Sequence, residues 1–358
     1  MSSSPYASAL GRHKAHLPEF LPKETWPRLA ASKDLNEVAK LLEASPYGPE
    51  IVRAAATQKG APMLESAINA TFVERNRRAF DSASFAGRPI VGAYLARWDL
   101  ENISIVLAAK ARGRPVTEDE HRLVSWRELP VGIPAGAMTL DALRALLAQP
   151  TLEATVNALV AFGYGATLLP LAETFARTHD IFPLVQALER EYYAKLFGAL
   201  RFFQGDEWVV LEVLRDEVDD RNAMLLLKAK EAGLSADEAI ARWIEGGRLP
   251  STAVPELLGA RTVAELVGTL QGRFPVLSEG LAQYEASKSL AGFELGLLHE
   301  RSVRSLRRMR AYPLSLAILM TYLLLAEVER ADLRRIVYGI LYGMSAETIE
   351  PMLIGPKL

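Results

Sequence analysis

The sequence predicts an all-α fold, and three observations support this prediction. Apolar residues recur at three- and four-residue spacing over long windows, alternating strand patterns are essentially missing, and Gly and Pro stand mainly between the windows. The chain has 358 residues, of which 50% are hydrophobic and 23% are charged. This composition is typical of a globular protein and is large enough for two or three domains, each with its own core.

Five windows carry the helical period most clearly. In chain order they are Leu35 to Leu42, Leu140 to Leu147, Leu184 to Phe197, Val209 to Lys230 and Leu316 to Tyr342. Two Ser/Thr-x-x-Glu patterns predict helix starts, because such side chains satisfy the unpaired N–H groups of a first turn. They are Ser235 with Glu238 and Thr117 with Glu120.

Two uncharged stretches, Ala154 to Ala172 and Pro313 to Ala326, were compared with the length of a membrane span. A transmembrane helix needs about 20 predominantly apolar residues. The first stretch is interrupted by Asn157 and Gly163, and the second is short and ends at Glu327. We therefore expect both to be buried helices, and any membrane contact to be peripheral.

Composition excludes several classes of protein. The chain has no Cys, and its formal net charge is −2. The absence of Cys rules out a disulfide framework, a thiolate metal site and a cysteine nucleophile, and it favours a reducing, cytosol-like compartment. A charge near zero argues against nucleic-acid binding. No signal or transit peptide is expected at the N-terminus, and neither a phosphate-binding Gly-x4-Gly-Lys-Ser/Thr loop nor a His-Glu-x-x-His motif occurs.

A helical motif occurs three times. In each copy an acid stands three residues before Asn or Asp, so the two polar side chains share one helical face. A Gly follows at a constant distance and predicts a helix end in the left-handed conformation. The copies are Asp99, Asn102, Lys110 and Gly113; Asp219, Asn222, Lys230 and Gly233; and Glu329, Asp332 and Gly343.

A second repeated block predicts the domain organisation. Leu249-Pro250 and the apolar residues after it align without gaps with the residues from Met138 onward, and also with Leu21-Pro22 and the residues that follow. The third copy of this block thus stands at the start of the chain, whereas its partner motif stands at the end. We expect three related helical units: residues 61–180, residues 181–274, and a split unit of residues 1–60 with 275–358.

Such a chain would close on itself as a ring or funnel with pseudo-threefold symmetry. An open stack of repeats is the alternative, because the number of repeats does not decide closure. Chance similarity among Leu-rich helices would explain the repeats without any common unit.

Clustered carboxylates leave one enzyme hypothesis open. All-α prenyl-diphosphate synthases hold magnesium with Asp-Asp-x-x-Asp, because hard oxygen ligands suit that ion. Here Asp219 and Asp220 are followed by Arg221, and the distal Asp is missing. A structural polar pair that serves packing explains the repeated motif better. A magnesium-dependent diphosphate enzyme that uses Asp219 and Asp220 stays an alternative.

A basic segment near the C-terminus contains Arg301, Arg304, Arg307 and Arg308 and no acid. Three of these arginines, Arg301, Arg304 and Arg308, share one helical face. The segment is either a solvated face or a partner interface that meets an acidic protein or anionic head groups.

The motifs together resemble one protein family. They are the helix Asp99 to Lys110, its second copy Asp219 to Lys230, the Leu-Glu-x-x-Tyr of Leu188 to Tyr192, and the closing segment Tyr322 to Ile336. Their order and spacing resemble the C subunit of the bacterial and archaeal rotary V/A-type ATPase, whose eukaryotic equivalent is the d subunit of the vacuolar enzyme. Ala108, Ala109 and Arg221 depart from the family pattern and affect expected local contacts only.

The resemblance implies a non-catalytic central-stalk adaptor: an all-α funnel of three similar domains, with no catalytic residues, cofactor or metal. It would sit on the membrane rotor ring of proteolipid subunits, at the cytoplasmic face of the membrane, and hold the central shaft. In this role it would couple ATP hydrolysis or synthesis to proton or sodium transport. A helical scaffold protein of another complex is the competing class.

Overall fold

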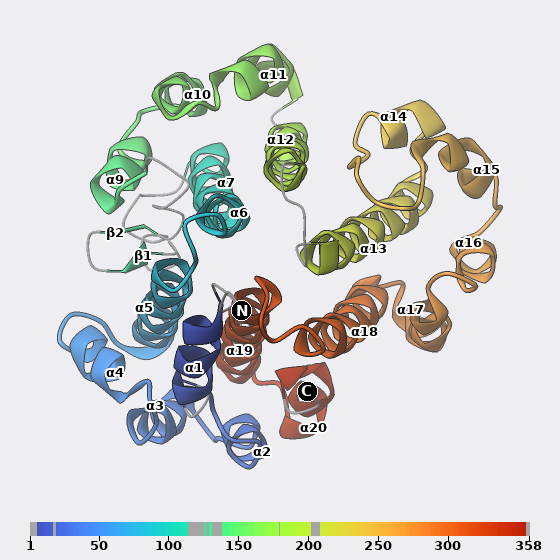
Figure 1. Cartoon of the computed structure of the whole chain (residues 1–358). Helices are drawn as coiled ribbons and strands as arrows, with labels where there is room; N and C mark the ends of the chain where they lie inside the picture. Colours follow the sequence, from blue (N-terminus) through green and yellow to red (C-terminus); the bar gives the residue numbers. More distant parts are fainter. Residues whose placement is uncertain are drawn as a thin grey trace, which may run out of the picture. The chain divides into compact units, whose positions relative to one another are not determined.

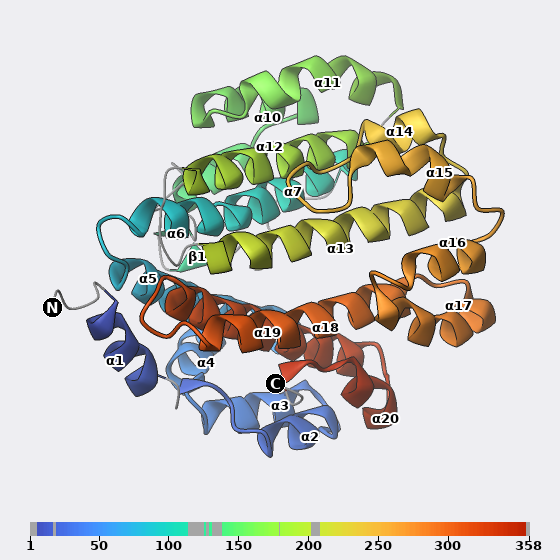
Figure 2. The same cartoon turned by 45° about the vertical axis from the view of Figure 1, so that its right-hand side comes forward.

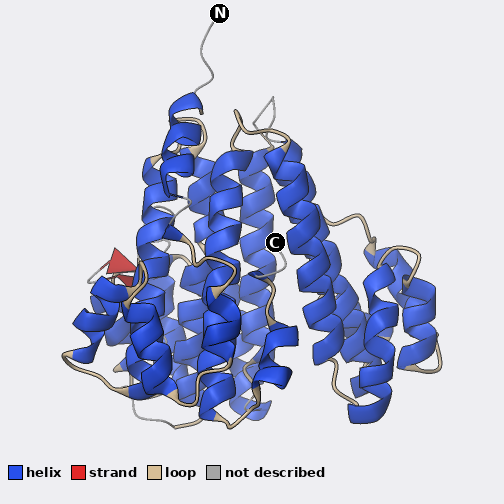
Figure 3. Cartoon of the chain, turned by 90° about the horizontal axis from the view of Figure 1, so that it is seen from below, coloured by secondary structure: helices blue, strands red, loops and turns tan. Residues whose placement is uncertain are grey.

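The computed structural model describes residues 6–16, 19–113, 125–126, 129–130, 138–178, 180–201 and 208–355. Helices make up almost all regular structure in these ranges (Figure 3), which confirms the all-α prediction. The exception within them is one antiparallel pair of two-residue strands, β1 (Ser125–Trp126) and β2 (Leu129–Pro130). The helix start expected at Thr117 and Glu120 lies outside the described residues.

The chain divides into two compact units. Unit 1 is Met1–Leu188 with Pro313–Leu358, and unit 2 is Glu189–Tyr312. Unit 1 thus joins the beginning and the end of the chain. The finer division into three repeated units is a proposal, to which we return below.

Unit 1 is built around two long antiparallel helices, α5 and α19, which pack against each other over most of their length (Figures 1 and 2). Helices α1 to α4, α6 and α20 pack against this pair. In chain order the helices are α1 (Ala7–His16), α2 (Thr25–Ala30), α3 (Leu35–Glu43), α4 (Gly48–Ala55), α5 (Gly60–Asp81), α6 (Arg88–Leu95), α7 (Arg97–Ala111), α9 (Leu140–Leu147), α10 (Leu152–Leu159), α11 (Gly165–Thr178), α19 (Ala317–Leu341) and α20 (Ala346–Ile349).

Two apolar clusters form the core of unit 1. One joins helices α2 to α5 to the second half of α19, and it contains Leu29, Leu42, Leu64, Leu333 and Ile336, all fully buried. The other packs α7 against α9, α10 and the start of α12 (Phe182–Leu200). The first cluster therefore buries apolar surface between segments at opposite ends of the sequence, and burial of this kind is the main stabilising term in folding.

Unit 2 is organised along α13, with α18 packed beside it. Its helices are the greater part of α12, then α13 (Trp208–Ala232), α14 (Ala236–Ile240), α15 (Val254–Leu258), α16 (Val263–Leu270), α17 (Leu281–Ser287) and α18 (Ala291–Arg310). Its apolar cluster joins the second half of α13 to α15, α16 and α18. The expected capping box is present at Ser235 and Glu238, where each residue bonds the backbone of the other.

The five windows with helical periodicity correspond to α3, α9, α12, α13 and α19. In the uncharged run Pro313 to Ala326, the residues from Ala317 onward form the largely buried first half of α19, as expected, whereas Pro313 and Leu314 precede the helix and are exposed. The run Ala154 to Ala172 differs: it breaks at Gly163, which has a φ of 80°, and Val160 and Leu169 are exposed. A turn that needs a left-handed residue divides this run into α10 and α11. In the described part of the chain, no helix is long and apolar enough to cross a bilayer.

Candidate functional site

Asp219 on α13 fixes a loop of unit 2. Its Oδ1 accepts hydrogen bonds from the backbone N–H groups of Arg248, at 2.7 Å, and Leu249, at 2.8 Å. Its Oδ2 accepts a bond of 2.7 Å from the guanidinium of Arg273. The Asp219 side chain is only 4% exposed. One buried carboxylate thus holds the chain just before Pro250, and charge-assisted bonds of this kind are the strong ones.

Glu329 on α19 has the role in unit 1 that Asp219 has in unit 2. Its Oε2 accepts a bond of 2.8 Å from the backbone N–H of Leu21, which precedes Pro22. Its Oε1 accepts bonds of 2.7 Å from Tyr47 Oη and from Arg75 Nη1. Leu21 is 308 residues away from Glu329. Asp219 and Glu329, matched in the sequence motif, therefore each bind the residue before a matched Pro.

The second polar residue of each motif also binds backbone. Asn222 exchanges two hydrogen bonds with Ile244, from Nδ2 to the carbonyl oxygen at 2.8 Å and from the backbone N–H to Oδ1 at 3.1 Å. Asp332 Oδ2 accepts bonds from Ile354 N at 2.9 Å and Gly355 N at 2.6 Å. Ile244 and Ile354 both stand 22 residues after their partner. The two copies thus share the same local geometry.

The first copy lies on α7, where Asp99 and Asn102 are fully buried. Within the described ranges neither carboxylate oxygen of Asp99 has a hydrogen-bond partner. Burial raises the pKa of Asp99 to about 8, because a charged carboxylate is unfavourable away from water. The chain from residue 114 to residue 124, where the counterpart of Ile244 would fall, lies outside the described residues.

The three motif glycines end their helices as predicted. Gly113, Gly233 and Gly343 have φ values of 62°, 67° and 74°. After Gly233, the N–H of Leu234 donates to Ala229 O at 2.9 Å, and after Gly343 the N–H of Met344 donates to Gly339 O at 2.8 Å. These are Schellman helix ends. Of the two motif lysines, Lys230 donates to Leu258 O at 3.1 Å, and Lys110 lies in the last turn of α7.

The basic segment on α18 divides into two faces. Arg304 and Arg308 both donate to Asp216 Oδ2 on α13 at 3.1 Å, and Arg301 Nε lies 3.7 Å from Asp220 Oδ2. Arg307 is exposed. The three arginines that share a face thus neutralise carboxylates of α13 inside unit 2, and of the four candidate interface arginines Arg307 is the most available to a partner.

Of the two carboxylates proposed for magnesium, Asp219 is bonded to protein groups, whereas the oxygens of Asp220 accept no hydrogen bond in the described chain and lie near Arg301, at 3.7 Å. Both oxygens of Asp219 accept protein hydrogen bonds, and Asp216 binds three arginines. Burial raises the pKa of Asp220 to about 7, against the opposing effect of Arg301. No group of three or more His, Asp or Glu in the described chain is placed to hold a metal ion. These contacts favour the structural interpretation of the motif.

Sequence reasoning missed a buried polar network between α5 and α19. Arg75 is 2% exposed, pairs with Glu329, and lies over the ring of Phe20 at 4.4 Å. Further along the helices, Arg330 Nε donates to Asn69 Oδ1 at 2.8 Å, and Arg334 Nε lies 2.7 Å from Glu65 Oε1. The signal in the sequence was helical spacing: Glu65, Asn69, Phe72 and Asn76 recur on one face of α5, and all are buried.

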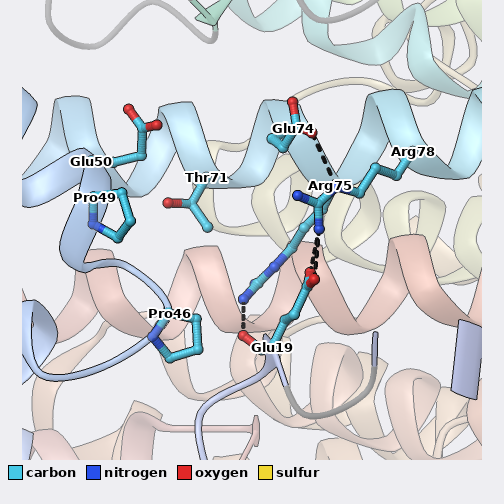
Figure 4. Close-up of a pocket in the computed structure, with 8 residues that line it drawn as sticks. All are labelled: Glu19, Pro46, Pro49, Glu50, Thr71, Glu74, Arg75 and Arg78. Carbon is cyan, nitrogen blue, oxygen red and sulfur yellow. Dashed lines mark hydrogen bonds and ion pairs between the residues drawn. The ribbon is translucent and has the colours of Figure 1, made fainter. Parts of the chain in front are cut away.

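A cavity of about 250 Å³ opens beside this network. Figure 4 shows that its charged side chains come from α4, α5 and the segment before α2. These charges compensate one another: Arg78 pairs with Glu19 at 2.6 Å and with Glu74 at 3.0 Å, and Arg75 Nη2 donates to Glu19 O at 2.5 Å. We therefore assign no ligand to it. The lining residues are Glu19, Pro46, Pro49, Glu50, Thr71, Glu74, Arg75 and Arg78.

Comparison with known proteins shows which family this chain is similar to. The family described as ATP synthase (C/AC39) subunit matches residues 9–352. The C subunit of the A-type ATP synthase of Thermoplasma acidophilum is 31% identical over 351 residues, which cover 98% of each chain. The equivalent proteins of Thermoplasma volcanium and Methanosarcina mazei, which carry the same name, are 29% and 28% identical, covering 98% of this chain and 98% and 93% of their own.

The match spans both units and every copy of the repeated motif, and the similarity extends over nearly the full length of the relatives. The chain therefore belongs to the ATP synthase (C/AC39) subunit family.

Proposed function

We propose that this chain is the non-catalytic central-stalk adaptor of a rotary V/A-type ATPase. One of its surfaces binds the membrane rotor ring at the cytoplasmic face, and another holds the central shaft. Rotation of the shaft is then passed to the ring, or rotation of the ring to the shaft, so that ATP hydrolysis or synthesis is coupled to proton or sodium transport. Membership of the ATP synthase (C/AC39) subunit family is the observation that carries this proposal.

Buried polar contacts support a mechanical role. A protein that passes torque between partners needs a body that does not open locally under load. Glu329, 4% exposed, connects α19 to Leu21, Tyr47 and Arg75. Removing one partner of such a group leaves an uncompensated buried charge, which is strongly unfavourable. Opening unit 1 between these segments would also expose the apolar cluster that joins α2–α5 to α19, and loss of this burial gives the opening its free-energy cost.

We also propose that the chain consists of three related units, with the third divided between residues 1–60 and 275–358. Three apolar clusters support the presence of three units, with bounds that differ from the expected ones: one cluster lies over residues 103–188, one over 223–297, and one joins 21–68 to 333–353. The matched bonds of Asp219 to Leu249 and of Glu329 to Leu21 support it as well.

The test of the proposed function is co-purification from detergent-solubilised membranes of the source organism. The tagged chain should recover the proteolipid of the rotor ring and the shaft proteins. Recovery of an unrelated complex would instead establish the scaffold alternative. Recovery of the chain alone, with diphosphate turnover that depends on Asp219 and Asp220, would establish the enzyme alternative.

Two variants of the basic segment on α18 are compared in the same co-purification test. Arg307→Glu should leave the free energy of unfolding unchanged, because Arg307 is exposed, and should weaken recovery of a partner that binds this face. Arg304→Glu is expected to destabilise unit 2 itself, because Arg304 donates to Asp216. Unchanged recovery with Arg307→Glu would remove this segment from the interface.

A further inference from the structure

Three segments of unit 1 meet at one end of its long helices. They are the start of α1, the loop of residues 82–87 between α5 and α6, and residues 313–316 before α19. Ser84 Oγ donates to Tyr6 Oη at 3.1 Å. Gly87 is packed so closely that a Cβ atom there would lie 2.5 Å from Tyr6 Oη and 3.2 Å from Leu316 Cδ1. These contacts hold the three segments together as one surface, which we call the α5–α6 end.

This end exposes two large apolar side chains. Phe85, in the loop between α5 and α6, is 95% exposed, and Leu314 is 50% exposed. Exposed aromatic and aliphatic side chains that gather on one surface mark an interaction site more often than single scattered ones do. The well-packed residues Tyr6 and Gly87 support the loop that carries Phe85, so the side chain projects from a fixed base.

The three segments that form this end contain no acid, and neither do α1, α6 and the first turns of α19. Residues 6–16, 82–98 and 313–326 contain no Asp or Glu. Arg88, the first residue of α6, is exposed and lies 5.7 Å from the centre of the Phe80 ring. Arg12 on α1 is also exposed. The carboxylate at this end of α5 is Asp81, the last residue of the helix, and it lies 3.7 Å from Arg77.

We propose that the α5–α6 end of unit 1 contacts the surface of a membrane that contains anionic phospholipids. Phe85 and Leu314 enter the head-group region, and Arg88 lies beside the phosphates. Charge complementarity selects this partner: Arg12 and Arg88 are exposed at this end and the exposed Asp81 is paired with Arg77, so the surface is attracted to a negatively charged leaflet by about 1 kcal/mol per basic residue. A single ring on a loop suits a fluid layer that closes around it, and aromatic rings are favoured at that depth.

This proposal rests on the proposed function and deepens it, since it names the surface that faces the membrane. The contact has few residues and is therefore weak by itself, like a single lipid anchor. A weak, non-specific lipid contact can slide as the adaptor turns with the rotor ring, whereas a tight one would resist rotation.

The experiment is flotation of the full chain with lipid vesicles at low salt. Vesicles of phosphatidylcholine alone are compared with vesicles that also contain phosphatidylglycerol. We expect the wild-type chain to float with the anionic vesicles and not with the neutral ones. Arg88→Gln should lower the partition coefficient about five-fold, the factor that corresponds to one basic residue at an anionic surface. Phe85→Ser should lower it further, and added salt should weaken the binding of every variant.

Matched controls come from the opposite end of α5. Val52→Ser removes an apolar side chain that is 60% exposed on α4, and Lys59→Gln removes an exposed cation just before α5. Both should bind vesicles as the wild type does. All four substitutions are at exposed positions, so thermal unfolding should be the same for each and would reveal any variant that is misfolded.

Two results overturn the lipid contact. One is equal binding of wild-type chain to neutral and anionic vesicles, and the other is binding of Phe85→Ser and Arg88→Gln equal to that of the controls. Co-purification with the rotor ring, measured on the same variants, distinguishes failure of the lipid proposal from failure of the proposed function. If the wild type recovers the ring but binds no vesicles, the lipid proposal is wrong and the adaptor proposal stands. If Phe85→Ser then also loses the ring, the α5–α6 end binds protein instead.

Discussion

Asp219 stabilises unit 2 through three protein donors at once. Two are backbone N–H groups of the loop before Pro250, and the third is the guanidinium of Arg273. Because the carboxylate is almost fully buried, water cannot replace these bonds when the side chain is removed. The contribution of Asp219 is therefore much larger than that of an acid on the surface.

We predict that Asp219→Ala lowers the free energy of unfolding by about 3 kcal/mol, the cost of breaking a buried charge pair. Urea denaturation followed by circular dichroism measures this change. Asp237→Ala is the matched control, because Asp237 is exposed on α14 of the same unit. Equal stability of the two variants would show that the bonds of Asp219 do not hold the loop.

Asp220 predicts a dependence of stability on pH. Burial raises its pKa to about 7 in the folded chain, whereas an unfolded Asp has a pKa of about 3.9. Between these values the folded state binds the proton and the unfolded state does not. The stability that this proton provides is fully present below pH 4 and is lost as the pH rises towards 7, by about 1 kcal/mol per pH unit.

The variant Asp220→Asn lacks this proton equilibrium. The difference in unfolding free energy between pH 5 and pH 8 should therefore be smaller for Asp220→Asn than for the wild type, whereas Asp237→Asn should resemble the wild type. Chemical denaturation at the two pH values gives both differences. If the difference in unfolding free energy between the two pH values were as large for Asp220→Asn as for the wild type, Asp220 would be ionised in the folded chain at both pH 5 and pH 8.

Individual residues were predictable from sequence only in part. The three-residue spacing placed Asp219 and Asn222 on one helical face, because that spacing fixes side-chain direction. Their bonding partners were not predictable, since these are backbone groups 22 to 30 residues further along the chain and, for Asp219, the side chain of Arg273, which is 54 residues away. Arg75 was missed because it stands in a charged stretch that, read alone, is typical of an exposed helix face; it is buried by α19 together with Phe20 and Tyr47.

At the scale of the element, the helix ends were the most predictable features. A Gly in the left-handed conformation allows the backbone to leave the helix at little cost, whereas a residue with a Cβ is strained there. Helix interiors were predicted as well, since a long apolar period has few alternatives. The break at Gly163 was not, because a single Gly inside an uncharged run interrupts the pattern without necessarily ending the helix.

We predict that Gly233→Ala lowers the free energy of unfolding by about 1 kcal/mol, the cost of the left-handed conformation for a residue with a Cβ. No atom lies within 4 Å of the position that the Cβ would take, so the effect is one of backbone conformation alone. Gly268→Ala in the middle of α16 is the control, and it should stabilise the chain, because Ala is the better helix former. Its Cβ would also meet no atom within 4 Å. Thermal or urea unfolding measures both changes. If both substitutions changed the free energy of unfolding in the same direction, this explanation would be wrong.

At the scale of the whole molecule, the two ends of the sequence fold as one body in unit 1. Glu329 on α19 binds Leu21, and the apolar cluster around Leu333 includes Leu29 and Leu42. A chain cut in the exposed stretch before α5 should therefore hold together. The sequence repeats suggested this joining of the ends, but the two-unit division did not follow from them.

We predict that residues 1–57 and 58–358, expressed as separate polypeptides, co-purify. Glu329→Ala in the larger fragment should reduce recovery of the smaller one at least ten-fold, since about 3 kcal/mol is lost with a buried charge pair. Glu347→Ala on α20 is exposed and should have no effect. Equal recovery with both variants would mean that the apolar cluster alone joins the fragments.

The proposed role of this chain is to link a membrane rotor ring to a central shaft. The most direct measurement is purification of the tagged chain from gently solubilised membranes, followed by mass spectrometry of what binds it. We predict that ring proteolipid and shaft proteins are recovered together, and that both remain with variants Val52→Ser and Asp237→Ala. Recovery of neither, from membranes in which the intact ATPase is shown to be present, would contradict it.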